Sequence, residues 1–177
     1  MLAFLKKKNP YEQAARDVYA GLLAASRRKE FFSNYGVPDN FDGRFDLLLL
    51  HIFIVVTRMT GEGKAGQDFN QALFDATFAD MDQTLREMGI GDMGIPKHMR
   101  RMMKAFNGRI HAYTEAAEQG EGALAVAVRR NLYGTLEDSE IPDVKIMVRY
   151  MTQSMDKIAR FSFADIAGGS VSFDLPE

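Results

Sequence analysis

Three features of this sequence could take part in chemistry: a histidine in an apolar run, a set of aspartates and a set of basic residues. The first is His51. His51 is the only polar residue in the run from Leu47 to Val56. It could ligate a cofactor or change its charge near neutral pH. A histidine inside an apolar run is more often held by one buried partner, and Asp46, Asp42 and several tyrosines are available here. We therefore expect His51 to be structural.

The second group is acidic. Asp75, Asp80 and Asp82 lie within one stretch, as do the aspartates that bind magnesium and a diphosphate in some helical enzymes. They do not form the dense Asp-Asp-x-x-Asp cluster of such a site, because four residues separate Asp75 from Asp80. We interpret them as solvated charges along one helix.

The common catalytic motifs are absent. The chain has no cysteine, which excludes thiol catalysis, disulfides and cysteine-ligated metals. Its serines do not occur in Gly-x-Ser-x-Gly, and residues 61–66 lack the spacing and the Lys-Ser/Thr pair of a phosphate-binding loop. Neither Glu-x-x-His nor His-Glu-x-x-His is present. We expect a protein that is not an enzyme, with no catalytic residues, no metal site and no cofactor.

The third group is basic. Lys97, Arg100, Arg101 and Lys104 follow one another closely in a chain whose formal net charge is only −2. This segregation could attract RNA, anionic lipid or an acidic protein. The alternative is that these residues pair with the acidic stretch at 68–87. The overall charge carries no excess of base of the kind seen in nucleic-acid-binding proteins, so we expect no sequence-specific contact with nucleic acid.

Methionine is frequent, with 11 residues, and it gathers around the glycine-rich connector at 89–95. Flexible thioethers suit a surface that must adapt to an apolar partner, although they also fill ordinary cores. We place a client-binding groove here. Its predicted walls are Met81, Met88, Met93, Met99 and Met103, and its predicted basic rim is Lys97, Arg100, Arg101 and Lys104.

These side chains need a scaffold, and the most apolar segment, Leu47 to Val56, predicts its centre. A helix that is apolar on all sides must be surrounded by others. Spacings of three and four predict five further helices, at about 10–29, 68–88, 96–119, 121–133 and 142–160. Residues 60–66 contain three glycines and predict a flexible loop. The fold class is therefore all-α: a single-domain bundle of about six helices around a central apolar one.

The two ends differ from the middle of the chain. Residues 1–9 are a basic arm in which Phe4 and Leu5 precede three lysines, and they lack the pattern of a secretory signal. Residues 10–163 form the predicted helical domain. Residues 164–177 form a tail that we expect to dock as an extended segment or to fray. The run at 47–56 is too short to span a membrane.

Four ordered stretches together resemble one protein family. They are Tyr-Gly-Val-Pro-Asp-Asn-Phe-Asp-Gly-Arg-Phe-Asp at 35–46 with the leucine-rich helix after it, Phe-Asp-Ala-Thr-Phe-Ala-Asp-Met-Asp at 74–82, Leu-Arg-Glu-Met-Gly-Ile-Gly-Asp at 85–92 and Arg-Asn-Leu-Tyr-Gly at 130–134. The sequence resembles the ubiquinol–cytochrome c reductase assembly chaperones over about residues 11–160. Without a targeting sequence, it is more similar to the bacterial members than to the mitochondrial ones.

The resemblance implies a non-enzymatic protein that binds newly made cytochrome b, an apolar membrane subunit of respiratory complex III, and supports its assembly. Mitochondrial members work with a small partner protein and with the ribosome. A cytoplasmic location with peripheral contact at the inner membrane would follow. Two other functions stay open: a binding protein or enzyme for a quinone or isoprenoid, with His51 and Asp75 in an enclosed pocket, and a basic membrane-binding module without a client.

The resemblance supplies no catalytic residues, and its motif positions can be explained by the fold. They are Tyr35, Gly36, Pro38, Gly43, Arg44, Asp46, His51, Asp80 and Asp82. A polar residue near a helix start accepts backbone N–H groups, and Arg44 can bridge to a carboxylate. We therefore expect Arg44→Ala to lower thermal stability rather than to remove client binding alone.

Overall fold

The computed structural model describes residues 9–175, in which the backbone forms eight α-helices and no strand. They are α1 (Glu12–Ser26), α2 (Lys29–Ser33), α3 (Phe41–Thr60), α4 (Gly63–Glu87), α5 (Ile95–Gln119), α6 (Glu121–Leu132), α7 (Lys145–Ala159) and α8 (Phe163–Ala167). The predicted all-α fold is confirmed, and the five-residue helices α2 and α8 add to the six predicted ones. The predicted basic arm lies outside the described residues, except for Asn9.

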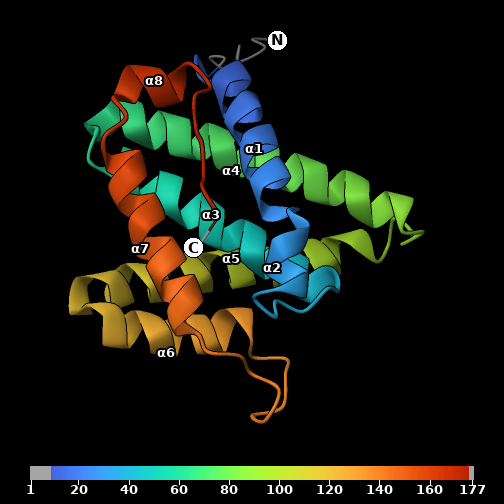
Figure 1. Cartoon of the computed structure of the whole chain (residues 1–177). Helices are drawn as coiled ribbons and strands as arrows, with labels where there is room; N and C mark the ends of the chain where they lie inside the picture. The colour runs from blue at the N-terminus through green and yellow to red at the C-terminus, as the bar shows by residue number, and fades with distance from the viewer. Residues whose placement is uncertain (1–8, 176–177) are drawn as a thin grey trace.

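Helix α3 is the centre of the bundle, as its composition predicts. The side chain of Asn40 caps it by accepting a hydrogen bond from the backbone N–H of Gly43, at 2.9 Å. Every residue from Leu47 to Val55 is at most 2% exposed. Helix α3 packs against α1, α4, α5, α6 and α7, and Figure 1 shows it crossing the middle of the molecule.

The chain reaches α3 through a tight turn that two glycines permit. Gly36 has a positive φ of 66°, which a residue with a side chain rarely adopts. Gly43 lies in the first turn of α3, where an added Cβ would meet the carbonyl oxygen of Pro38 at 2.1 Å. The segment 36–38 therefore packs directly against the start of α3, and this contact fixes how α3 begins.

The prediction of a flexible loop at 60–66 is wrong. Helix α4 starts at Gly63, and only Gly61 and Glu62 separate it from α3. Arg58 pairs with Glu62 at 2.5 Å and also donates to the carbonyl oxygen of Phe161. At Gly66 an added Cβ would lie 1.9 Å from the carbonyl oxygen of Met59. The glycine at position 66 allows α3 and α4 to approach closely and does not make the segment flexible.

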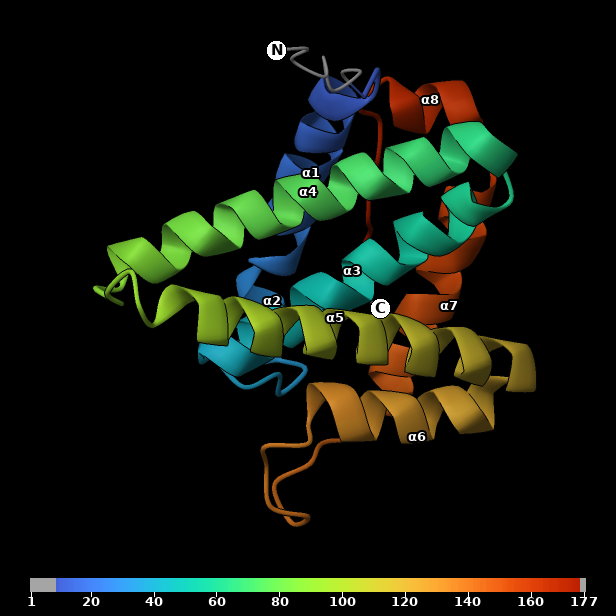
Figure 2. The same cartoon turned by 180° about the vertical axis from the view of Figure 1, so that it is seen from behind.

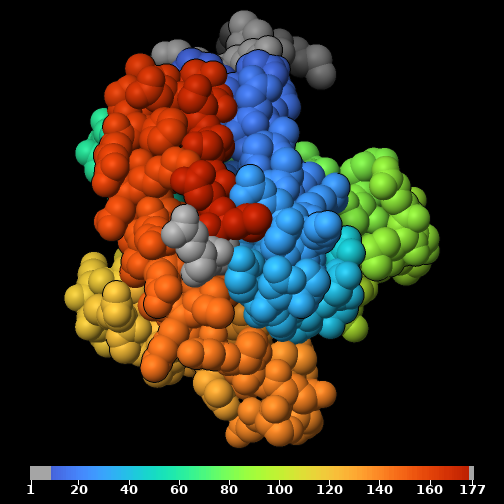
Figure 3. All heavy atoms as spheres, viewed as in Figure 1, coloured from blue at the N-terminus to red at the C-terminus, as the bar shows by residue number. Residues whose placement is uncertain are grey.

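Helices α4 and α5 form a long hairpin whose closed end projects from the bundle. Figure 2 shows the two helices converging towards their connection and enclosing α3 at their open end. In the space-filling view, the connection stands out as a separate lobe (Figure 3). None of the helices within residues 9–175 combines the length and the apolar composition needed to cross a lipid bilayer.

The C-terminal segment is partly helical and then extended. Ser162 and Asp165 form a capping box that starts α8, a helix that the prediction of an extended or frayed tail did not include. Beyond α8 the chain crosses the bundle, and Phe173 is buried with its ring centroid 4.9 Å from that of His51. Arg28 donates to the carbonyl oxygen of Phe173 at 3.0 Å. The division of the chain at residue 164 stays a prediction.

Candidate functional site

A partly apolar surface lies around the half-buried Phe41 and the buried Phe45, near the start of α3. Two hollows flank this pair of aromatic rings and share both of them. One, of about 240 Å³, lies between α3, α5 and Thr135. The other, of about 220 Å³, lies between α1, α3 and α4. We call the two hollows together the α3 groove.

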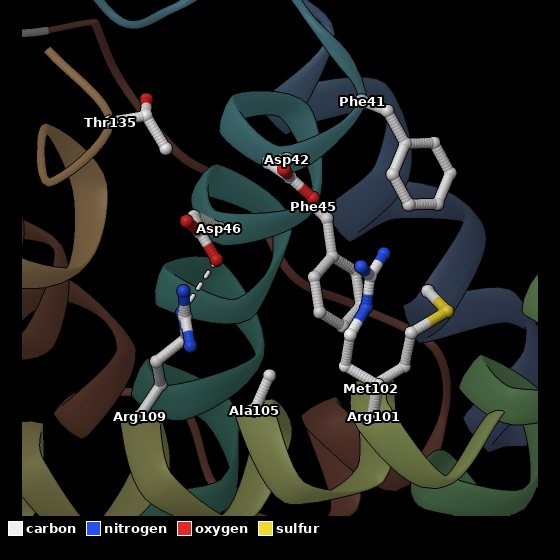
Figure 4. Close-up of a pocket in the computed structure, with 9 residues that line it drawn as sticks. All are labelled: Phe41, Asp42, Phe45, Asp46, Arg101, Met102, Ala105, Arg109 and Thr135. Carbon is white, nitrogen blue, oxygen red and sulfur yellow. Dashed lines mark ion pairs between the residues drawn. The ribbon is translucent and has the colours of Figure 1, made fainter. Parts of the chain in front are cut away.

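The walls of the α3 groove are apolar and its edge is basic. Leu23, Leu48 and Met81 line the hollow on the α4 side, and Met102 and Ala105 line the hollow on the α5 side. Three exposed arginines belong to the same lining, Arg27, Arg44 and Arg101, together with one exposed carboxylate, Asp42. In Figure 4 the side chains of α3 and α5 face one another across the hollow beside α5.

An ion pair lies at the inner end of the hollow beside α5. Arg109 Nε approaches Asp46 Oδ1 to 2.5 Å (Figure 4), although its N–H does not point at the oxygen in a good hydrogen bond. Asp46 is 5% exposed, and burial raises its pKa to about 6 in spite of the opposing charge of Arg109. Near this pair, the hydroxyl of Tyr113 is buried without a hydrogen-bond partner, and burial raises its pKa.

The five methionines predicted to bind a client lie on different surfaces. Met81 lines the α3 groove and is 6% exposed. Met88 and Met93, at the closed end of the α4–α5 hairpin, are 56% and 98% exposed. Met99 is half-buried against the core, and Met103 is 39% exposed on the outer side of α5. The structure therefore does not bring all five into one groove.

The four residues of the predicted basic rim are all exposed on α5. Lys97, Arg100, Arg101 and Lys104 form no ion pair with any described residue. The acidic residues of α4 have other partners, which excludes pairing between the two helices within the described chain. Asp82 pairs with Arg86 at 2.7 Å, and Asp80 accepts from the hydroxyl of Tyr19 at 2.7 Å.

His51 is fully buried and both of its ring nitrogens are engaged. Nδ1 donates to the carbonyl oxygen of Leu47 at 2.8 Å, so the neutral ring accepts at Nε2 from the hydroxyl of Tyr150, at 2.6 Å. Burial lowers its pKa to about 4. Asp75 is exposed on α4 and accepts from Gln71. The two residues do not share a pocket, which removes the main support for a quinone or isoprenoid site.

The remaining motif residues hold the start of α3 and its surroundings. The backbone carbonyl of Tyr35 accepts from the hydroxyl of Tyr133 at 2.8 Å. Arg44 pairs with Asp39 at 2.7 Å and lies over the ring of Phe32. Because both partners of this pair are more than half exposed, its contribution to stability is about 0–1 kcal/mol. The loss of stability expected for Arg44→Ala is therefore small.

Comparison with known proteins decides the family. The family model described as "Ubiquinol-cytochrome C chaperone" matches residues 33–173. The chain belongs to this family. Its curated relatives include the mitochondrial protein CBP3 of Saccharomyces cerevisiae, which is 30% identical over 84% of this chain and 45% of its own length. Another relative is ubiquinol-cytochrome c reductase complex assembly factor 1 of Mus musculus. It is 26% identical over 86% of this chain and 52% of its own length.

A solved structure supports membership of the ubiquinol-cytochrome c chaperone family. The crystal structure of the Cbp3 homolog from Brucella abortus superposes with a TM-score of 0.80 and 37% identity, and the match covers 93% of this chain and 90% of that one. The chain spans about half the length of the curated relatives. The family is described as a chaperone and the mouse relative is named as an assembly factor. The predictions of family, fold and a non-enzymatic protein are confirmed.

For this member of the chaperone family, sequence reasoning missed most of the α3 groove. Phe41, Phe45 and Leu48 recur at intervals of four and three, which is one face of a helix. The stretch at 35–46 was interpreted as a motif explained by the fold, and neither Phe41 nor Phe45 was proposed as a binding residue. In the structure Phe41 is half-buried and Phe45 is buried. Within residues 9–175, no three His, Asp or Glu side chains lie close enough together to hold a metal ion.

Proposed function

We propose that this protein binds newly made cytochrome b, or another apolar subunit of the ubiquinol–cytochrome c reductase complex, and holds it until the complex assembles. The observation that carries the proposal is the α3 groove, an open apolar surface with a basic edge in a chain whose relatives are named as assembly factors of this complex. A helix or loop of the client would place apolar side chains beside Phe41 and Phe45.

The chemistry of the groove suits a client that is bound and later released. Open apolar patches edged by polar residues are typical of protein-binding surfaces. The thioethers of Met81 and Met102, which face the two hollows, can adapt to different apolar side chains. The exposed Met88 and Met93 lie on the same hairpin and would extend the contact towards its closed end.

We further propose that the protein works from the cytoplasm in peripheral contact with the inner membrane, where such a client is inserted. The resemblance implies a small partner protein and the ribosome for mitochondrial members. No surface of this chain is assigned to either of them.

Deletion of the gene tests the proposed function. We expect less cytochrome b, measured by its absorbance, and lower activity of the reductase complex. Restoring the gene with Phe41→Ser should leave both low, because losing a buried phenylalanine contact of about 1.5–3 kcal/mol weakens binding roughly 10- to 100-fold. Phe163→Ser, in a half-buried phenylalanine of the distant helix α8, is the matched control and should restore both. A normal complex in the deletion strain contradicts the proposal.

A further inference from the structure

Beside the α3 groove, helices α5 and α6 form a third hollow whose charged lining residues are mostly basic. It measures about 500 Å³, and its cations are Arg101, Lys104, Arg109 and Arg130, with His111 beside them. Figure 2 shows α5 and α6 side by side on one outer face of the molecule. Arg101 also lines the α3 groove, so the two surfaces adjoin.

Most of this charge is not neutralised within the protein. Arg101, Lys104 and Arg130 form no ion pair with any described residue, whereas the neighbouring Arg129 pairs with Asp138 at 2.8 Å. One carboxylate, Glu115, lines the hollow, and it lies 3.4 Å from His111. It is 14 positions after Arg101, or roughly 21 Å along a helix. The part of the hollow around Arg101 and Lys104 is therefore strongly positive, and Arg130 adds a further unpaired cation from α6.

Exposed apolar side chains accompany these cations. Met103 is 39% exposed on α5, three residues after Arg100 and therefore on the same side of the helix as Arg100. Val126 is 67% exposed, one helical turn before Arg130 on α6. Basic and apolar side chains on one helical face are typical of contacts with the interface of a lipid bilayer.

The same surface is poorly suited to single-stranded nucleic acid. Such binding depends on aromatic rings that stack against bases. The aromatic residues of α5, Phe106 and Tyr113, are buried, and α6 contains no aromatic residue. A positive surface with exposed aliphatic side chains and no exposed phenylalanine, tyrosine or tryptophan ring on α5 or α6 favours a phospholipid.

We propose that the α5–α6 basic surface, made of Lys97, Arg100, Arg101, Lys104 and Arg130, binds the phosphate groups of anionic phospholipids. Met103 and Val126 then enter the interfacial region of the bilayer. This contact would bring the adjoining α3 groove to the membrane surface. The inference deepens the peripheral membrane contact of the proposed function, but it rests on the α5–α6 surface and does not require the client.

Co-flotation of the purified full chain with vesicles tests this inference. We expect the protein to float with vesicles of phosphatidylcholine and phosphatidylglycerol, and to float much less with phosphatidylcholine alone. Each basic residue near an anionic surface strengthens binding about fivefold. The triple variant Arg101→Glu/Lys104→Glu/Arg130→Glu should therefore lower the partition coefficient by about 100-fold or more. High salt should weaken binding by the wild-type protein.

A matched variant separates a local surface from overall charge. Arg16→Glu/Arg149→Glu/Arg160→Glu changes the net charge equally at exposed positions on α1, on α7 and directly after α7. It should bind anionic vesicles far better than the first triple, with both triples retaining wild-type circular dichroism. Three results would overturn the inference: no flotation by the wild type, equal flotation with both lipids, or equal loss in both triples.

The test of client binding is independent of the test of vesicle binding. If vesicle binding fails while a crosslinker at position 41 still captures cytochrome b, the membrane inference falls and the proposed function stands. If vesicle binding succeeds while no client is captured, the lipid surface stands and the client proposal falls. Binding to RNA or to an acidic peptide without binding to vesicles would assign the basic surface to another partner. It would overturn the proposal that this surface binds phospholipids.

Discussion

At the scale of single residues, Asp46 and His51 are two buried ionisable groups of α3 that respond to pH in opposite ways. Burial raises the pKa of Asp46 to about 6 in the folded protein, above the ordinary value of 3.8. Burial lowers the pKa of His51 to about 4, below the ordinary value of 6.5. Between about pH 4 and 6, the folded state holds the proton on Asp46 more tightly and the proton on His51 less tightly than the unfolded state.

The first prediction concerns Asp46→Asn. The wild-type carboxylate costs stability at neutral pH, and this cost disappears as pH falls through 6 towards 4. Relative to the Asn variant, the wild type should therefore gain up to about 3 kcal/mol of unfolding free energy between pH 7 and pH 4. Urea unfolding at several pH values measures this difference. A difference that does not change with pH would show that Asp46 stays ionised in the fold.

His51→Gln is the control variant, for which the stability difference from the wild type should change with pH in the opposite direction. The neutral imidazole stabilises the fold above pH 6.5, and this contribution is lost as pH falls towards 4. Relative to the Gln variant, the wild type should lose stability as pH falls over the same interval. A change common to both variants would come from the overall charge of the protein instead.

Part of this residue-scale picture could be predicted from the sequence. A histidine inside an apolar run indicated a buried partner, and a tyrosine was among the partners considered. That the partner is Tyr150, 99 positions away, depends on how α7 packs on α3. Likewise, Asp46 was expected to take a structural role, but its pairing with Arg109 required the register between α3 and α5.

At the scale of elements, the start of α3 depends on a close backbone approach that the second prediction tests. Gly43→Ala places a methyl group against the carbonyl oxygen of Pro38, at 2.1 Å before any relaxation. We expect a loss of about 1–3 kcal/mol in unfolding free energy by urea titration. Gly61→Ala is the matched control, because its Cβ would meet nothing within 4 Å. It should be neutral or stabilise by up to about 1 kcal/mol. Equal effects at both sites would contradict this account of the turn.

The helices themselves were mostly predictable, because apolar spacing determines which face each one buries. The exceptions are segments in which a glycine is needed for close helix packing, or in which a short helix depends on its capping hydrogen bonds. Gly63 and Gly66 predicted a loop, yet Gly66 allows α4 to pass close to the end of α3. Helix α8 depends on the reciprocal hydrogen bonds of Ser162 and Asp165 within a segment too short to show a clear apolar period.

At the scale of the whole molecule, the α3 groove is assembled from α1, α3, α4, α5 and Thr135. No single stretch of sequence contains it. The methionines and the basic residues predicted a binding surface in the α4–α5 region, and of these residues Met81 and Arg101 line the groove. Its central residues, Phe41 and Phe45, were not proposed as binding residues, since an apolar helical face looks the same in sequence whether or not another helix covers it.

The most direct test of client binding is site-specific photocrosslinking in growing cells. A photoreactive phenylalanine analogue replaces Phe41 in one strain and Phe163 in another, and crosslinked products are identified with an antibody to cytochrome b. The α3 groove predicts a cytochrome b adduct from position 41 and none from position 163. No adduct from position 41 in a strain that still assembles the reductase complex, or equal adducts from both positions, would contradict the assignment of the client to this groove.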